Sequence, residues 1–172
     1  SSAASDVYKR QVGVLFDQGK FFLPQLMASA EAARVGFDTI KRLMPAGEIA
    51  DKGKICVATV KGDIHDIGKN IVRVLLENYG YTVLDLGKDV PCQLVADTAK
   101  EHNVKLVGLS ALMTTTLGAM EETIQLVKAA CPDCKVVVGG AVLTADYAEK
   151  IGADFYAKDA METVAVAKQV VG

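Results

Sequence analysis

The sequence is poor in the side chains from which most protein metal sites are built. Its 172 residues include only two histidines, His65 and His102, and only four cysteines. A zinc or iron site made from protein ligands normally uses three or four side chains, often several histidines. This composition therefore argues against a metal ion that is held by protein side chains alone.

Other absences argue against two broad classes of function. The formal net charge is −2 and there is no basic patch, so the composition gives no support to nucleic-acid binding through phosphate neutralisation. There is no run of 18 apolar residues and no signal peptide, which predicts a soluble, cytoplasmic protein. The 51% of hydrophobic residues suffices for one substantial core and a small appendage.

The cysteines give little indication of redox or metal chemistry. Cys56 falls within a predicted buried strand, and this small number of cysteines indicates reduced thiols. Cys131 and Cys134 form a CxxC motif, which occurs in redox pairs and as half of a zinc site. Because no second CxxC or histidine pair accompanies it, we favour a plain turn between a helix and a strand.

The most informative stretch runs from Ile55 to Gly80 and predicts a strand, a loop and a helix. β-Branched residues at 55–60 indicate a buried strand, and apolar residues at three- and four-residue spacing indicate a helix from about 67 to 78. Between them lie Asp63, His65 and Gly68, where a parallel α/β sheet presents its chemistry. A carboxylate two residues before a histidine can accept its second ring N–H. A cofactor that brings most of its own metal ligands would need only this histidine.

The same loop has two alternative interpretations, a phosphate-binding loop and a simple helix cap. A phosphate-binding loop needs four residues between its first glycine and Gly-Lys, followed by Ser or Thr. Here five residues separate Gly62 from Gly68, and Asn70 follows Lys69. Two carboxylates also stand where phosphate would lie. The simpler alternative is that Asp63 and Asp66 cap the helix and His65 is an exposed loop residue. The loop alone leaves that alternative open.

The rest of the chain predicts an alternation of strands and helices. Strands are expected at 81–86, 106–109, 135–138 and 155–157, and helices at 91–101, 117–130, 145–151 and 160–171. Five strands alternating with helices imply an α/β fold with a parallel, doubly wound sheet of the flavodoxin or Rossmann-like type. The strand-to-helix loops at 63–68, 110–116, 139–141 and 157–160 should then converge at one edge of the sheet.

Three ordered motifs resemble the signatures of cobalamin-binding domains. They are Asp63-x-His65-x-x-Gly68, Ser110-x-Leu112 and Gly139-Gly140. The first and second motifs are separated by 41 residues and the second and third by 26, as in the methionine synthase type. Three motifs in this order and at these intervals are far more specific than any one of them.

The resemblance implies a cofactor and a role for each matching residue. Methylcobalamin would bind base-off, with His65 as the lower axial ligand of its cobalt. Asp63 matches the carboxylate bonded to that histidine, and Thr116 the hydroxyl-bearing third member, where methionine synthase has serine. The positions that match cofactor-binding residues are Gly62, Asp63, Ile64, His65, Asp66, Ile67, Gly68, Ser110, Leu112, Thr114, Gly139, Gly140, Ala141, Tyr156, Ala157, Asp159 and Ala160.

The N-terminal part is expected to lie outside the sheet domain. Residues 1–11 indicate a non-native or truncated junction. Residues 12–48, with a helix from about 22 to 44, resemble an incomplete form of the helical cap that precedes cobalamin domains. The cap would place Phe16, Leu23 and Leu26 over the corrin, with ordinary helix packing as an equal alternative. The cobalamin-binding domain would span residues 49–172.

The resemblance further implies a corrinoid methyl carrier. Such a protein shuttles a methyl group between a donor-specific methyltransferase and an acceptor methyltransferase. Catalysis belongs to those partners, and a reductive activator serves the corrinoid; neither nucleic acid nor a membrane is expected as a partner. The alternatives are a cobalamin-binding fragment of a methionine synthase and a cobalamin-binding regulatory or sensor module. The carrier is favoured because the helix at 160–171 ends the chain and no DNA-binding segment is visible.

Overall fold

The computed structural model describes residue 28 and residues 52–172. The chain divides into two units, Ser1–Ile49 and Ala50–Gly172, and the described range 52–172 falls in the second. The expected junction, all of the cap and its helix at 22–44 except residue 28, and the cap residues Phe16, Leu23 and Leu26 lie outside the described residues, and these calls stay predictions. None of the helices in the described part is long and apolar enough to cross a membrane.

Five strands form a single parallel sheet in the described range. They are β1 (Lys54–Thr59), β2 (Thr82–Asp85), β3 (Leu106–Ser110), β4 (Lys135–Gly139) and β5 (Phe155–Tyr156). Their order across the sheet is β2-β1-β3-β4-β5, and every pairing is parallel. The predicted doubly wound α/β sheet is thus confirmed. The strand order reverses between β1 and β3, which is where such sheets bind ligands.

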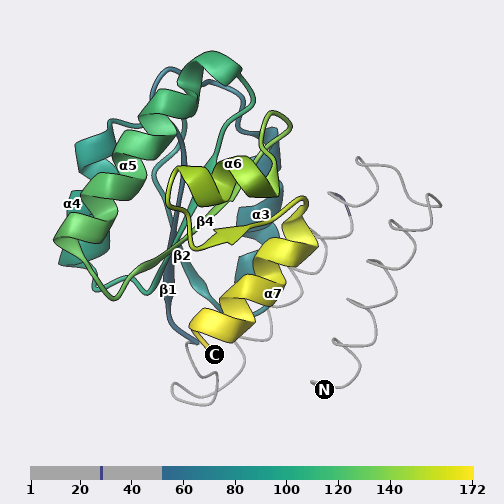
Figure 1. Ribbon diagram of the computed structural model, residues 1–172. Helices are drawn as coiled ribbons and strands as arrows, with labels where there is room; N and C mark the ends of the chain where they lie inside the picture. The colour runs from purple at the N-terminus through teal and green to yellow at the C-terminus, as the bar shows by residue number, and fades with distance from the viewer. Residues whose placement is uncertain (1–27, 29–51) are drawn as a thin grey trace, which may run out of the picture. The chain divides into compact units, whose positions relative to one another are not determined.

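Helices cover both faces of the sheet (Figure 1). They are α3 (Ile67–Asn78), α4 (Cys92–Glu101), α5 (Leu117–Ala130), α6 (Ala145–Lys150) and α7 (Ala160–Val170). Helices α3 and α7 pack together on one face, and α4 and α5 on the other. The sheet is therefore the middle of three layers. The loops that connect strands and helices lie at the two ends of the strands.

Each face of the sheet carries its own apolar core, because alternate residues of a strand point to opposite sides. Ile55 and Val57 of β1 belong to the core that includes Leu76 of α3. Cys56 of β1 belongs to the other core, with Ile124 of α5. All of these side chains are almost wholly buried. A strand buried on both sides explains why its sequence is a continuous apolar run.

The structure adds one element that periodicity did not predict. A short 3₁₀ turn, Thr114–Thr116, precedes α5. Threonine has a low helix propensity, but the Thr116 hydroxyl donates to the carbonyl of Met113 at 2.8 Å and so closes the turn. The predicted turn at the CxxC motif is confirmed, since the N–H of Cys134 donates to the carbonyl of Cys131 at 3.0 Å. All four cysteines, each within the described range, are free.

Candidate functional site

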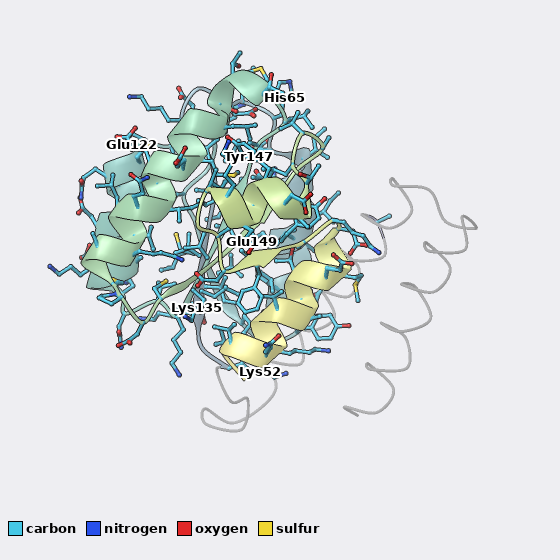
Figure 2. All side chains as sticks on the ribbon, viewed as in Figure 1. Lys52, His65, Glu122, Lys135, Tyr147 and Glu149 are labelled. Carbon is cyan, nitrogen blue, oxygen red and sulfur yellow. The ribbon has the colours of Figure 1, made fainter. Side chains whose placement is uncertain are left out.

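The loops that follow the strands meet at one end of the sheet, as their topology predicts. Figure 2 shows His65 at the opposite end of the domain from Lys52 and Lys135, which lie where β1 and β4 begin. The N–H of Ala111 donates to the carbonyl of Gly139 at 3.2 Å, which joins the loops after β3 and β4. The predicted convergence of these loops is therefore observed.

The loop after β2 also belongs to this end, although it was missing from the predicted set. Asp89 accepts a hydrogen bond from the N–H of Gly62 at 2.7 Å. Its own N–H donates to the carbonyl of Asp63 at 2.9 Å. The loop after β2 therefore supports the chain on both sides of the turn that leads to Asp63. Nothing in its sequence spacing pointed to this contact, which depends on the position of β2 at the edge of the sheet.

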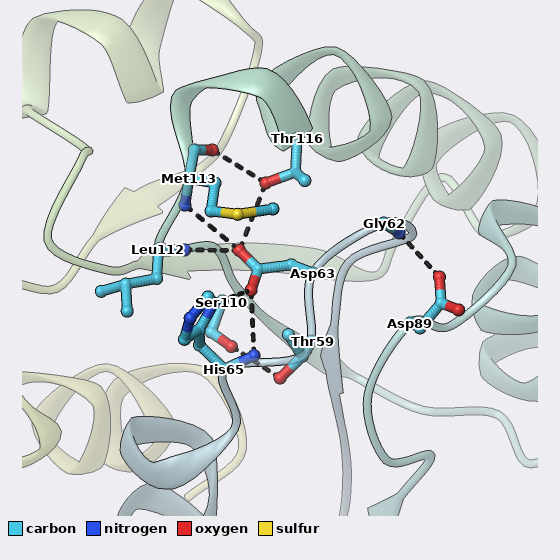
Figure 3. A network of polar contacts seen from close by, with 9 residues as sticks. All are labelled: Thr59, Gly62, Asp63, His65, Asp89, Ser110, Leu112, Met113 and Thr116. Atoms are coloured by element: carbon cyan, nitrogen blue, oxygen red, sulfur yellow. Dashed lines mark hydrogen bonds and ion pairs between the residues drawn. The ribbon is translucent and has the colours of Figure 1, made fainter.

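Asp63 is the centre of a polar network that links two loops (Figure 3). Its carboxylate is completely buried. Oδ1 accepts from the backbone N–H of His65 at 3.0 Å and lies 2.8 Å from His65 Nδ1. Oδ2 accepts from the N–H groups of Leu112 at 2.7 Å and Met113 at 3.2 Å. A buried carboxylate requires such partners, so this network fixes the His65 loop against the end of β3.

The same network determines the charge of Asp63 and the tautomer of His65. Burial by itself raises the pKa of Asp63, but hydrogen bonds from Leu112, His65 and Met113 outweigh it and lower the pKa from 3.8 to about 2. The carboxylate is thus ionised at neutral pH and can only accept hydrogen bonds. Nδ1 of a neutral His65 is therefore the protonated nitrogen, and Nε2 carries the lone pair. A metal ligand requires that lone pair.

Large apolar side chains are exposed close in sequence to the residues of the Asp63 network. The His65 side chain is 46% exposed. Ile64, Ile67 and Leu112 are 62%, 63% and 43% exposed, and they are three of the four exposed large hydrophobic residues in the described part of the chain. These three residues are called the apolar rim: Ile64 lies in the His65 loop, Ile67 is the first residue of α3, and Leu112 lies in the loop after β3. Exposed apolar residues gathered at one place mark a binding surface.

Thr116 joins the network, but its hydroxyl has two acceptors for one hydrogen. Its Oγ1 lies 3.3 Å from Oδ2 of Asp63 and 2.8 Å from the carbonyl oxygen of Met113. The shorter distance favours the carbonyl. The structure therefore brings His65, Asp63 and Thr116 together as predicted, with Asp63 bonded strongly to His65 and weakly to Thr116.

The capping alternative for the two aspartates is not supported. Asp66 occupies the N-cap position of α3, but within the described residues its side chain makes no capping hydrogen bond. The Asp63 carboxylate accepts hydrogen bonds from the N–H groups of Leu112 and Met113, in the loop after β3, and does not cap the helix. The helix thus begins without a side-chain cap, and the Asp63 carboxylate is bonded to the His65 imidazole.

The paired glycines after β4 are required by the protein's own backbone. A Cβ on Gly139 would lie 2.9 Å from the carbonyl oxygen of Ala157, and one on Gly140 would lie 1.8 Å from that of Ala111. Gly140 also has φ of +138°, which favours glycine. Close backbone approach between the ends of the strands thus accounts for this motif. Its predicted role beside a ligand tail stays a prediction.

The remaining predicted positions lie around the same end, several with partners inside the protein. The Ser110 hydroxyl lies 3.0 Å from the hydroxyl of the fully buried Thr59, a residue that was not predicted. The Tyr156 hydroxyl donates to the carbonyl of Leu143 at 3.2 Å. Asp159 caps α7 by accepting from the N–H of Glu162 at 2.9 Å. The others are placed as follows: Gly68, Thr114 and Ala141 are exposed, Ala157 is buried, and Ala160 begins α7.

The donor set suits a metal that arrives with its other ligands in place. Within the described residues no group of three or more His, Cys, Asp or Glu side chains could hold a metal ion. His65 offers one imidazole nitrogen, oriented by Asp63, and the exposed residues of the apolar rim belong to the same loop, the helix that follows it and the loop that Asp63 joins to it. A metal in a large, partly apolar macrocycle fits one axial nitrogen and a surrounding apolar surface.

Comparison with known proteins identifies relatives over most of the chain. A family model described as a B12 binding domain matches residues 53–165, and a second with the same description matches residues 10–41. Dimethylamine corrinoid protein 1 of Methanosarcina acetivorans is 48% identical over 164 residues, which are 94% of this chain and 77% of that protein.

Solved structures agree with this result. A cobalamin-binding protein from Desulfitobacterium hafniense is 36% identical with a TM-score of 0.84, and the match covers 100% of this chain and 85% of that one. A chain of the methanol:cobalamin methyltransferase complex from Methanosarcina barkeri is 32% identical with a TM-score of 0.81, and the match covers 95% and 64% of the two chains.

Proposed function

The chain belongs to the B12-binding family, and we propose that it is the corrinoid methyl carrier of a methylamine methyltransferase system. A donor-specific methyltransferase would load the methyl group and an acceptor methyltransferase would remove it, with a reductive activator as a third partner. The 48% identity to a dimethylamine corrinoid protein supports a methylated amine as the methyl donor. The likeness to a chain of a methanol:cobalamin methyltransferase complex supports methyltransferase partners.

The observation that carries the proposal is the half-exposed imidazole of His65, whose inner nitrogen is held by a buried carboxylate. The described residues fit a corrinoid because they offer one oriented ring nitrogen and an apolar rim of Ile64, Ile67 and Leu112. The apolar rim does not stabilise the folded domain, since three large apolar side chains gain nothing from exposure to water.

Each residue has a defined task in this proposal. Bound cobalamin supplies the cobalt atom that carries the methyl group. His65 would bind that cobalt from below through Nε2, in the base-off, His-on manner. Asp63 holds the proton on Nδ1, which makes the imidazole a better electron-pair donor at Nε2. The apolar rim would contact the bound macrocycle and exclude water there.

Cobalamin titration of the purified protein tests the binding step. We expect a visible spectrum typical of a base-off, histidine-ligated form. His65→Ala should retain part of the affinity through contacts of the nucleotide tail but lose the histidine-ligated spectrum. His102→Ala is the matched control, because His102 is the exposed C-cap residue of α4. An identical spectrum for wild type and His65→Ala would contradict the assignment.

A methyl-transfer assay tests the donor class. The cobalamin-loaded, reduced protein is mixed with a dimethylamine-specific or a methanol-specific methyltransferase and the corresponding methylated substrate. We expect methylation of the corrinoid with dimethylamine and its methyltransferase. If only methanol and its methyltransferase methylate the corrinoid, the methyl donor is an alcohol and not an amine. Failure with both, by a protein that binds cobalamin with His65, would contradict the carrier role.

A further inference from the structure

Lys69 is a buried lysine in the first turn of α3, four residues after His65. Only 3% of its side chain is exposed, and its Nζ lies 2.6 Å from Oδ1 of Asp85 and 2.9 Å from Oδ1 of Asn70. Lysine is rarely buried unless it is paired. Its ammonium group is turned into the protein, so the Gly-Lys sequence that invited comparison with a phosphate loop serves an internal contact instead.

Asp85, at the end of β2, is itself fixed to the central strand. Its Oδ1 also accepts from the N–H of Gly87 at 2.9 Å. The carbonyl of Gly87 accepts from the N–H of Thr59, the last residue of β1, at 2.9 Å. The chain then passes from Thr59 to Asp63 and through the His65 loop back to Lys69. Lys69 and Asp85 therefore close a ring of contacts around that loop.

The start of α3 has few other anchors. Among the described residues, Asp66 makes no capping bond with its side chain and no acidic residue stands in the first turn. Ile67 and Gly68 of that turn are exposed. The Lys69 side chain is thus the buried polar anchor of the first turn. Asp63 fixes one end of the His65 loop, and Lys69 fixes the other.

We propose that Lys69, paired with Asp85, is a positioning residue for His65. By holding the first turn of α3, it keeps the imidazole with Nδ1 on Asp63, so that Nε2 carries the lone pair. The value of this arrangement rests on the proposed function, because a cobalt ligand must present Nε2 in one direction. The arrangement itself is a property of the protein without cofactor and is measurable there.

A double variant separates positioning from stability. Removing one charge of a buried ion pair leaves the other unpaired, whereas replacing both by neutral groups often preserves stability. Lys69→Met with Asp85→Asn removes both charges and retains an acceptor for the N–H of Gly87. Asp85 Oδ2 also lies 3.5 Å from Nε of Arg73, but the Arg73 side chain is 39% exposed and the amide oxygen of asparagine can still accept from it. A pair that only stabilises the fold would leave His65 unchanged in this variant. If the pair positions His65, the tautomer of His65 should change in this variant.

The test is nitrogen NMR of the cofactor-free protein labelled with ¹⁵N-histidine. Two sets of ring-nitrogen signals are expected, one from each histidine, and the exposed His102 is the internal reference. In the wild type, neutral His65 should be predominantly the Nδ1–H tautomer. In the double variant its ring shifts should move toward those of His102, and cobalamin affinity should fall roughly tenfold, the lower end of losses seen when support of a metal ligand is removed.

Lys128→Met is the matched control. Lys128 pairs with Asp154 at 3.4 Å, on α5 and in the turn before β5, and not at the His65 end. This variant should leave both the His65 tautomer and the affinity unchanged. Should the double variant fail to fold, Lys69→Met alone gives the same readout, because Asp85 is 21% exposed and keeps Arg73 Nε at 3.5 Å and the N–H of Gly87 at 2.9 Å as partners.

The outcomes are distinguishable. A double variant with wild-type thermal unfolding and an altered His65 tautomer supports the positioning role. An unaltered His65 spectrum in the folded double variant, or in Lys69→Met, overturns it. If the tautomer depends on Lys69 but the wild type does not bind cobalamin, the proposed function fails while the positioning role stands.

Discussion

Replacing Asp63 by asparagine should disturb both the stability of the domain and the tautomer of His65. Asparagine has nearly the same shape as aspartate, but it offers one acceptor oxygen and one NH₂ group. The carboxylate serves two groups of donors, His65 on Oδ1 and the N–H groups of Leu112 and Met113 on Oδ2. An amide can satisfy only one group, so its NH₂ must face donors on the other side.

The magnitude follows from the hydrogen bonds that are lost. If the amide oxygen keeps Leu112 and Met113, the NH₂ faces the backbone N–H and the Nδ1 of His65. The imidazole can adapt by moving its proton to Nε2, but the backbone N–H cannot. With about 1 to 3 kcal/mol for each unsatisfied buried donor and the loss of charge assistance, we expect a decrease of about 2 to 4 kcal/mol in the free energy of unfolding.

Acid unfolding gives an independent value for the same carboxylate. The pKa of Asp63 lies at about 2 in the folded protein, below its ordinary 3.8. A lowered pKa stabilises the fold fully above pH 4, and this contribution is lost as the pH falls toward 2. The difference between these two pKa values corresponds to about 2 kcal/mol in the free energy of unfolding. Asp63→Asn should lack this part of the pH dependence, because an amide does not titrate.

The assay is urea unfolding of the cofactor-free proteins at pH 7 and between pH 4 and 2. Asp89→Asn is the matched control, since Asp89 accepts one N–H, from Gly62, and an amide oxygen retains that bond. It should cost less than about 1 kcal/mol. A free energy of unfolding for Asp63→Asn within 0.5 kcal/mol of wild type, with the same acid dependence, would refute the reasoning.

Three further predictions concern other parts of the domain. Gly140→Ala should cost about 2 kcal/mol or more in urea unfolding, since its φ is +138° and its Cβ would meet the Ala111 backbone, whereas Gly118→Ala should stabilise α5 by up to about 1 kcal/mol. Cys56 and Cys134 should resist iodoacetamide in the native protein from pH 8 to pH 10, because burial raises the pKa of each to about 12; rapid labelling of either, followed by mass spectrometry, would contradict this. Ile64→Asn should weaken cobalamin binding roughly tenfold yet leave the free energy of unfolding within about 0.5 kcal/mol, as expected for an exposed side chain; equal affinity would exclude Ile64 from the binding surface.

The fold could be predicted well because its signals are local. The apolar run of β1 and the spacing of α3 identified both elements, and the alternation of elements implied the parallel sheet. The 3₁₀ turn at Thr114–Thr116 was missed because it depends on one side-chain bond to Met113. Strand ends differed by about one residue, since the last pairs are set by neighbouring strands.

The site could be predicted where its residues are close in sequence. Asp63 and His65 are two residues apart and were identified with their hydrogen bond. Lys69 and Asp85 are 16 residues apart, and their contact depends on how α3 lies against β2, which no local pattern encodes. The glycines after β4 were recognised as a motif, but the backbone contacts that require them became visible only in three dimensions.

Ligation of cobalt by His65 is the central claim, and electron paramagnetic resonance of the cobalt(II) protein tests it most directly. The His102→Ala variant, labelled with ¹⁵N-histidine, contains a single labelled imidazole, that of His65. We predict that the nitrogen splitting of the cobalt signal changes from the ¹⁴N to the ¹⁵N pattern on labelling. A spectrum that is unchanged by the label would contradict the account, because the axial nitrogen would then not be that of His65.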